Sequence, residues 1–478
     1  SLQAQQYQLN RLQTVNLNKA AGYAYTTNNV ATLAPKPNGG AYIQWATNNG
    51  FSNRSRCGAT SNVYVTEVNN AGQVQGPDML LGQSLPYGIA ATPTGFGYLI
   101  GDGDKLIFRT VNNRNQTGST TIMNHRAKGN CGHYTPYPES GLADPGLDFG
   151  VSGAAWAFST PYLPGKGDIA FGGSEFATAF GQSNDWKRSR EDGLNDTHSG
   201  DAYITFNQTA GHARLSEAKT DHSLDRRIEY IGNNTFVSVR LNDVSGLRLY
   251  KHKNGQLIDN DKLFVTKTDY TNQNGSITSD QSYQTKRCPN NPDCPMENSY
   301  GIGGNGGGTS FGFLGDLHSV GDGTLALTYG IRPGNFEHGS GAYVQKQTKN
   351  QLDFARLDAN GNVIIRRNLF QPDGRVDQGN YTEFQPYERL AWVKSVMVPS
   401  GYVIFFKTEI SNGAVNNPRY TPSSTRMMQI DANGIITQQP TPVPAAVSFN
   451  RSDEVEMLSN GTIDWTSTIG GTLKLHLI

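Results

Sequence analysis

The chain has 478 residues, with 40 basic and 40 acidic side chains, so its formal net charge is zero. Neutrality without a cationic stripe argues against a nucleic-acid partner. No apolar run approaches the roughly 18 residues that a membrane-spanning helix needs, which argues against membrane insertion. Charged residues make up only 17% and glycine contributes 55 residues, a composition that favours short strands and tight turns over long helices.

An alternating apolar strand, a Gly/Asn turn and a second strand recur along the chain. Period-two patterning around such a turn predicts a β-hairpin. Six of the copies are followed by a second hairpin, and D-A-N-G at Asp358 and Asp431 predicts two of those turns. The seven first hairpins lie at Val30–Thr47, Tyr87–Ile100, Gly153–Gly173, Arg226–Leu241, Leu317–Gly330, Leu390–Glu409 and Val455–Thr468.

Two hairpins per unit make a four-stranded antiparallel blade, so the sequence predicts an all-β, seven-bladed β-propeller. The last unit lacks a strand, and Tyr7–Leu17 is a strand without a hairpin of its own. We therefore expect the N-terminal strand to pair with the C-terminal blade and close the ring. Stacked sandwiches or a β-helix are the alternatives. We expect one domain over residues 1–478, with blades near 28–81, 85–118, 151–216, 225–260, 317–366, 388–438 and 453–478 plus 7–17.

The long insertions are expected on one face of the propeller. If the strands of a blade are called a to d, the a–b and c–d turns lie on one face, and the b–c and d–a connections lie on the other. The first set is short, whereas the second carries the insertions, so we call its side the loop-rich face. Loops of such length in a compact domain are usually functional. The insertions cover residues 118–150, 182–200, 259–316, 332–351, 371–388 and 410–425.

Reactive side chains follow these insertions and predict a ligand-binding groove on the loop-rich face. Imidazole and phenol groups can exchange protons, arginine can neutralise a carboxylate, and an exposed indole can stack on a sugar ring. A polar surface without a groove is the alternative. The residues expected to bind a ligand are His125, Arg126, Tyr137, Trp186, Tyr300, His318 and His338.

An even number of cysteines in a Gly/Asn-rich chain favours disulfides and an oxidising compartment, so we expect a secreted, extracellular or periplasmic protein. Cys288 and Cys294 enclose a short turn, which leaves Cys57 with Cys131; four reduced thiols are the alternative. The absence of a leader before Ser1 is what a processed secreted chain or a trimmed one would show. Nine N-x-Ser/Thr sequons permit glycosylation.

One weak metal site is indicated. Asp192, Asp196 and Asp201 could hold Ca²⁺ through their carboxylates, and a solvated loop explains the same residues. The sequence indicates no other cofactor.

Three functions follow from these features. The first is a secreted propeller that binds an extracellular polysaccharide or glycan in the groove. The second is a polysaccharide-degrading enzyme, more readily a lyase than a hydrolase, because a lyase needs a base, an acid and a cation that neutralises a uronate. The third is a structural cell-surface protein. The sequence leaves these functions and the oligomeric state open. The residues expected to carry the lyase chemistry are His133, Tyr134, His198, His222 and Arg226.

Overall fold

The computed structural model describes residues 7–21, 23–24, 28–29, 31–47, 62–83, 85–102, 105–124, 168–181, 201–218, 223–242, 246–265, 269–271, 277–279, 284–286, 296–298, 312–321, 323–331, 344–345, 351–372, 387–412, 419–449, 453–468 and 470–478. These residues form strands and one short 3-10 helix, Leu9–Arg11. Among them, no helix has the length and apolar character needed to cross a bilayer.

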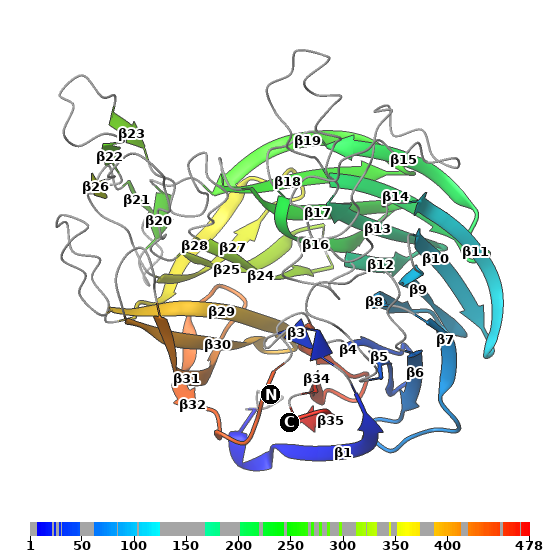
Figure 1. Ribbon diagram of the computed structural model, residues 1–478. Coiled ribbons are helices and arrows are strands. Elements are labelled where there is room, and N and C mark those ends of the chain that lie inside the picture. Colours follow the sequence, from blue (N-terminus) through cyan, green and yellow to red (C-terminus); the bar gives the residue numbers. More distant parts are fainter. Residues whose placement is uncertain are drawn as a thin grey trace.

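Seven four-stranded antiparallel sheets form the blades (Figure 1). Blades 1 and 2 consist of β4 (Ala31–Pro35), β5 (Ala41–Ala46), β6 (Asn62–Val68), β7 (Met79–Gln83), and β8 (Leu85–Ala91), β9 (Gly95–Asp102), β10 (Lys105–Asn112), β11 (Asn115–Asn124). Blades 3 and 4 consist of β12 (Asp168–Gly172), β13 (Glu175–Gly181), β14 (Asp201–Asn207), β15 (His212–Ala218), and β16 (Ser223–Gly232), β17 (Thr235–Asn242), β18 (Gly246–Lys253), β19 (Gln256–Val265). Blades 5 and 6 consist of β24 (Gly312–Ser319), β25 (Leu325–Ile331), β27 (Gln351–Leu357), β28 (Val363–Phe370), and β29 (Tyr387–Val398), β30 (Gly401–Asn412), β31 (Arg419–Ile430), β32 (Ile436–Pro442).

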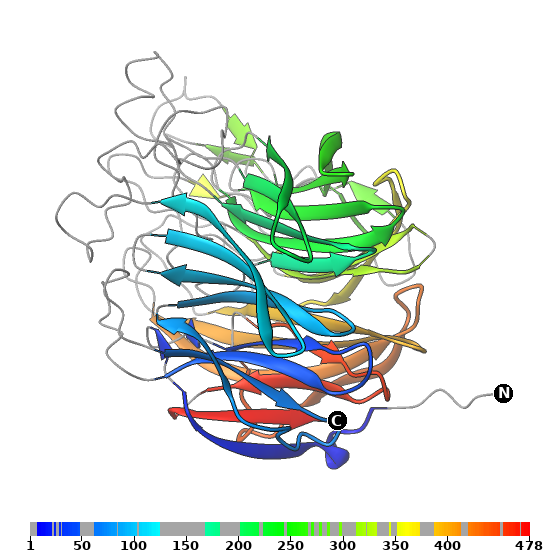
Figure 2. The ribbon, with the colours of Figure 1, turned by 90° about the vertical axis from the view of Figure 1, so that its right-hand side faces the viewer.

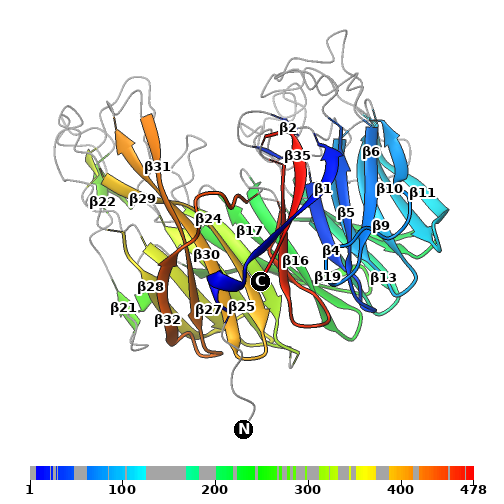
Figure 3. The same cartoon turned by 90° about the horizontal axis from the view of Figure 1, so that it is seen from below.

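Blade 7 confirms the predicted closure. It consists of β33 (Glu456–Met457), β34 (Ile463–Ser467), β35 (Thr472–Leu477) and, from the other end of the chain, β1 (Gln13–Ala20) (Figure 3). β1 pairs antiparallel with β35 and becomes the outermost strand. The strand begins at residue 13 rather than at residue 7 because the 3-10 helix precedes it. The side chain of Tyr7 is buried instead, and its hydroxyl donates a hydrogen bond of 2.9 Å to the carbonyl of Gly461.

The innermost strands form a closed ring. Contacts run from β4 to β8, β12, β16, β24, β29, β33 and back to β4. In the side view of Figure 2, the strands of blades 1 and 2 (blue to cyan) lie side by side. The all-β, seven-bladed β-propeller predicted from the hairpins is therefore confirmed.

The apolar core lies between neighbouring blades rather than within one sheet. Ile43 and Leu475 belong to one cluster between blades 1 and 7, and Phe405 and Trp465 belong to another between blades 6 and 7. Between blades 2 and 3, the ring of Phe108 stacks on Phe206 with ring centroids 4.1 Å apart. Because each face of a blade needs its neighbour to exclude water, the ring of blades is stable only when it is complete.

Four of the c–d hairpins turn by the same device. A side-chain oxygen at the first turn position accepts hydrogen bonds from the backbone N–H groups two and four residues later. The residue three positions on has a positive φ, which glycine adopts without strain. This Asx turn recurs in blades 1, 3, 5 and 6, and explains the two D-A-N-G segments. The acceptors are Asn69, Asn207, Asp358 and Asp431.

Two features differ from the predicted pattern. In blade 3 the first hairpin turns at residues 173–174, where Gly173 has φ +64°, and not within the predicted hairpin's Pro-rich middle. Its predicted first strand, near residues 153–159, lies outside the described residues. The insertions also contain short strands: β22 (Gln284–Lys286) pairs with β23 (Met296–Asn298) and with β26 (Val344–Gln345), which joins two separate insertions (Figure 1).

We expect removal of residues 1–20 to destabilise the propeller strongly. The deletion removes β1 and leaves β35 as an open sheet edge, which favours association between chains. Thermal unfolding should show a lower Tm, and size-exclusion chromatography should show aggregation. Removal of residues 1–6 alone serves as the control, since it spares Tyr7 and β1. Equal Tm values for the two truncated proteins would show that the closure does not stabilise the ring.

Candidate functional site

An acidic cavity lies between the inner strands of five blades. Its volume is about 220 Å³, and β4, β8, β12, β16 and the segment that leads into β33 line it. This is smaller than the roughly 300–1,000 Å³ of clefts that hold drug-sized ligands, so the cavity suits one small chemical group or one sugar ring. We call it the axial cavity. Its ionisable and aromatic lining consists of Phe171, Glu229, Tyr230, Asp453, Glu454 and Glu456.

The two sides of the axial cavity differ in chemistry. Blades 1 to 3 contribute small apolar side chains, including Ala34, Ala90 and Ala170, together with Phe171. Blades 4 and 7 contribute all the carboxyl groups that line it. The cavity is therefore apolar on one side and acidic on the other.

Successive side chains of β16 point to opposite sides of the strand. Ile228 and Tyr230 project to the side of blade 3, where they pack with its apolar residues. Arg227 and Glu229 share the other side of the strand. Gly172 of blade 3 makes room for the aromatic ring, because a Cβ atom there would lie 2.0 Å from Cγ of Tyr230.

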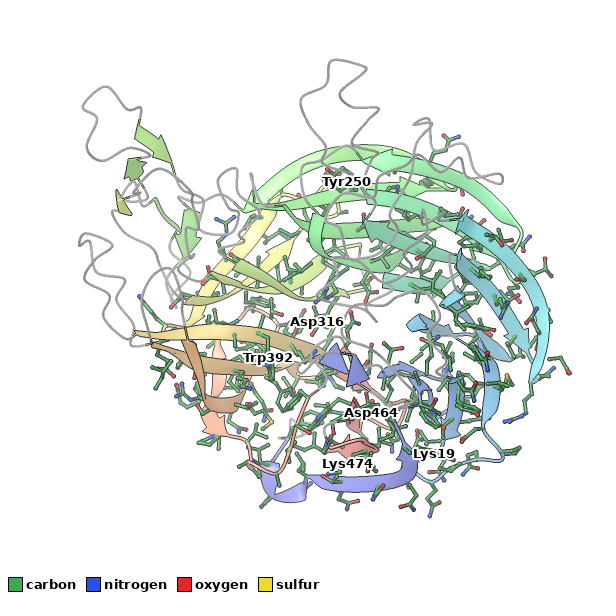
Figure 4. All side chains as sticks on the ribbon, in the orientation of Figure 1. Lys19, Tyr250, Asp316, Trp392, Asp464 and Lys474 are labelled. Carbon is green, nitrogen blue, oxygen red and sulfur yellow. The ribbon has the colours of Figure 1, made fainter. Side chains whose placement is uncertain are left out.

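A buried arginine joins three blades beside the cavity. Nε of Arg227 lies 3.5 Å from Oδ1 of Asp316 in blade 5 and 3.4 Å from Oε1 of Glu454 in blade 7. Its Nη2 also donates a hydrogen bond of 3.3 Å to the carbonyl of Leu314. Asp316, labelled near the middle of Figure 4, accepts a further hydrogen bond from the backbone N–H of Ser395 in blade 6. One cation thus compensates two carboxylates.

Asp453 fastens blade 7 to its neighbours. Its Oδ1 accepts a 3.0 Å hydrogen bond from the backbone N–H of Leu33 in blade 1, and its Oδ2 accepts one of 2.5 Å from the hydroxyl of Thr466. Lys394 of blade 6 donates a hydrogen bond to its backbone carbonyl. Burial raises the pKa of Asp453 to about 6, while its hydrogen bonds act in the opposite direction. These contacts give Asp453 a structural role although it lines the cavity.

Three other carboxyl groups also have raised pKa values, and a backbone hydrogen bond at Glu229 and at Asp464 only partly offsets the rise. Burial, and then the negative charge of Glu454, raises the pKa of Glu229 to about 8. The same two causes raise the pKa of Glu456 well above its usual value, and burial followed by the charge of Asp453 does so for Asp464. At neutral pH Glu229 therefore holds its proton, so it can donate a hydrogen bond as well as accept one.

The described residues contain no group of three or more His, Cys, Asp or Glu side chains placed to hold a metal ion. Of the predicted calcium ligands, Asp201 is the first residue of β14, and the other two lie outside the described residues. The calcium site therefore stays a prediction.

Most of the predicted groove also lies outside the described residues and stays a prediction. Arg226 belongs to β16, next to the arginine that joins the blades. The residues outside the described ranges are His125, Arg126, His133, Tyr134, Tyr137, Trp186, Asp192, Asp196, His198, His222, Tyr300, His338 and the four cysteines, Cys57, Cys131, Cys288 and Cys294.

The position of His318 differs from the prediction. It is the next-to-last residue of β24, which runs away from the loop-rich face, so it lies beside the short a–b turn. Burial lowers its pKa to about 4, and its Nε2 lies 2.9 Å from Oγ of the buried Ser395. The imidazole is therefore a neutral packing group. The prediction assigned the whole glycine-rich run to the insertion and so placed His318 at the loop-rich face. In the structure, β24 already begins inside that run, at Gly312.

The comparisons with known proteins leave the family open. No family model matches the chain, and no curated protein sequence matches it. Among solved structures, the subtype N10 neuraminidase-like protein of A/little yellow-shouldered bat/Guatemala/060/2010 aligns with 83% of this chain and 96% of its own at 11% identity and a TM-score of 0.36. BBS1N, in its complex with ARL6DN, aligns with 97% of this chain and 96% of its own at 10% identity and a TM-score of 0.37. A chain of the mitotic checkpoint complex aligns with 98% of this chain and 91% of its own at 9% identity and the same score. At such scores these likenesses carry no argument about what the chain does.

We expect the stability of the protein to fall as the pH rises from 6.5 to 8. The folded state keeps the proton of Glu229 up to about pH 8, whereas the unfolded chain loses it near pH 4.5, so rising pH favours unfolding. Burial lowers the pKa values of His318 and His476 from 6.5 to about 4, so these two histidines affect the stability mainly below pH 6.5. Glu229→Gln should reduce the fall in Tm between pH 6.5 and 8, and Glu67→Gln in blade 1 should not. Equal slopes for wild type and Glu229→Gln would contradict the assignment.

We expect Arg227→Met to lower the free energy of unfolding by about 3–5 kcal/mol, because it leaves the buried Asp316 without its cation. The matched control is Arg114→Met. Arg114 is 43% exposed and lies 3.6 Å from Glu67, and such surface pairs contribute about 0–1 kcal/mol. Chemical denaturation measures both values. A loss as small as that of the control would show that Arg227 does not hold the blades together.

Proposed function

We propose that this protein is a binding propeller that holds one residue of an extracellular glycan in the axial cavity. The two-sided lining of the cavity is the observation that carries the proposal. A sugar ring has apolar C–H faces and a rim of hydroxyl groups, which suits aromatic and small apolar side chains on one side and carboxyl groups on the other. Tyr230 and Phe171 supply the aromatic surface, and Glu229, Glu454 and Glu456 supply the polar partners.

The charge of the cavity favours a neutral or basic glycan over an acidic one. All ionisable side chains of its lining other than Tyr230 are carboxyl groups, and the neighbouring Arg227 already faces two carboxylates. A uronate would therefore meet like charge without a free cation to neutralise it. This counts against a lyase reaction in the axial cavity. The lyase prediction depends on the loop-rich face, and its catalytic side chains are not among the described ones.

The size of the cavity limits what enters it. A volume of about 220 Å³ accepts a single ring, so we expect the rest of a glycan to lie outside the cavity. Secretion and the glycan class both remain part of the proposal, since they follow from composition and from the chemistry of the lining.

We expect calorimetry against neutral and amino oligosaccharides to detect binding that a filled cavity abolishes. Ala90→Phe places a ring in the cavity from β8, and Ala170→Leu fills it from β12; each should weaken binding at least tenfold. Val74→Phe is the control, because Val74 is 39% exposed and lies in blade 1 away from the cavity. Circular dichroism establishes that each variant is folded.

Two outcomes would contradict the proposal. The first is a wild-type protein that binds none of the sugars. The second is a sugar that folded Ala90→Phe and Ala170→Leu bind as tightly as the wild type does, since its site would then lie elsewhere.

A further inference from the structure

We propose that the N-terminal segment is an acid-sensitive strap, and that protonation of His476 detaches β1 from β35 while the other blades stay closed. The strap consists of residues 7–20, which end in β1 and complete blade 7 (Figure 3). The inference does not depend on the proposed function, because it concerns the closure of the ring and not the axial cavity.

The pairing of the strap with the sheet is limited. Among the eight described residues of β1, Leu17 alone is buried, whereas all five residues of β34 are buried. Regular pairing with β35 runs from Gln13 to Asn16 and is interrupted before Ala20. The strap can therefore leave the sheet with a smaller loss of buried surface than any inner strand.

Polar side chains fasten the two ends of the strap to the blades on either side. At its start, the backbone carbonyl of Tyr7 accepts a hydrogen bond of 2.8 Å from Nε2 of Gln429 in blade 6. Near its end, Nζ of Lys19 lies 2.7 Å from Oδ2 of Asp78 in blade 1 (Figure 4). The strap thus spans blade 7 and joins blade 6 to blade 1.

His476 holds the middle of the strap. Its Nδ1 lies 2.9 Å from Oγ1 of Thr14 on β1, and its Nε2 lies 2.9 Å from Oγ of Ser467 on β34. The ring also stacks on Trp465 with centroids 5.2 Å apart, and the residue is completely buried. A neutral imidazole suits two hydroxyl partners, because one of its nitrogens donates a hydrogen bond and the other accepts one.

A proton on His476 disturbs this arrangement. An imidazolium ion has two N–H donors, so the hydroxyl that donates to the neutral ring has to reorient and give up that hydrogen bond. Thr14 and Ser467 carry no negative charge that could compensate the new positive one. Burial of an unpaired charge is unfavourable, so the protonated ring favours a state in which water reaches it.

The charged groups of blade 7 oppose the proton or lie elsewhere. Burial, and then the positive charge of Lys474 on the same strand, lowers the pKa of His476 to about 4. Asp464 precedes Trp465 on β34 and so points to the opposite side of the sheet. Tyr7, in the same apolar cluster as Trp465, stays neutral because burial raises its pKa.

Blade 6 adds positive charge on this side. Val396 and Phe405 belong to the cluster between blades 6 and 7. Alternation along β29 and β30 therefore places Lys394 and Lys407 on the side that faces blade 7. A proton on His476 meets like charge from this direction as well.

Detachment of β1 is the smallest change that hydrates the ring. Because β1 is the outermost strand and Thr14 covers Nδ1 from it, β35 becomes the sheet edge once β1 leaves. The attachment is at full strength above pH 6.5, the ordinary pKa of histidine, and weakens as the pH falls toward 4. These two values make the detached population rise about thirtyfold between pH 7.5 and pH 5.

The test is hydrogen exchange measured by mass spectrometry at pH 7.5 and pH 5, with rates corrected for the pH dependence of exchange in a free chain. We expect the opening constant of β1 to be about thirtyfold larger at pH 5, while β29 and β30 stay protected at both pH values. His476→Gln can still bond to both hydroxyls but does not titrate, so the ratio should fall below threefold.

His318→Gln is the matched control. His318 also has a pKa of about 4 and contacts a buried serine, but it belongs to β24 in blade 5, so the ratio for β1 should stay as in the wild type. Three results would overturn the inference: equal opening constants of wild-type β1 at the two pH values, loss of protection in β1 and blade 6 together, or an undiminished ratio in His476→Gln. The first two need no variant, so they decide the question even if His476→Gln does not fold.

Discussion

A closed ring of inner strands forces charged side chains into contact near the axis, and their mutual compensation is the constraint on which the propeller depends. Arg227 of blade 4 reaches Asp316 of blade 5 and Glu454 of blade 7. Lys394 of blade 6 donates to the backbone carbonyl of Asp453, and the carboxyl group of Asp453 accepts a hydrogen bond from a backbone N–H of blade 1. Five blades are joined in this way through groups that are tolerated in an interior only when they are paired.

The rest of the ring is joined by neutral contacts, and this difference creates the two-sided cavity. Gln44 of blade 1 accepts a hydrogen bond from the backbone N–H of Gly88 and donates one to the carbonyl of Leu99, both in blade 2. Blades 2 and 3 meet through stacked phenylalanines. Because no charge is needed there, small apolar residues can face the axis, while the carboxyl groups gather on the side of blades 4 and 7.

The fold was predictable because hairpin patterns and turn residues are local signals. Period-two alternation and the D-A-N-G turns give the blades, and a strand without a partner at each end of the chain gives the closure. The axial cavity was not predicted, because it depends on which inner strands face one another. Acidic residues inside apolar inner strands, such as Glu229 in RRIEYIG and Asp316 in FLGDLH, were the available signal. Period-two alternation from the apolar Ile228 would also have placed Arg227 and Arg226 on opposite sides of the strand.

The buried acids Glu229, Glu456 and Asp464 are hard to explain by stability alone. A glutamine at position 229, or an asparagine at position 464, would keep the shape of the side chain without the cost of ionising a buried acid. Proteins tolerate such costs where a group serves binding or catalysis, and purely structural positions tend to lose them. Glu229 and Glu456 line one cavity, and Asp464 pairs with Glu456 from the neighbouring strand. These buried acids are therefore better explained by a role in binding than by a contribution to stability.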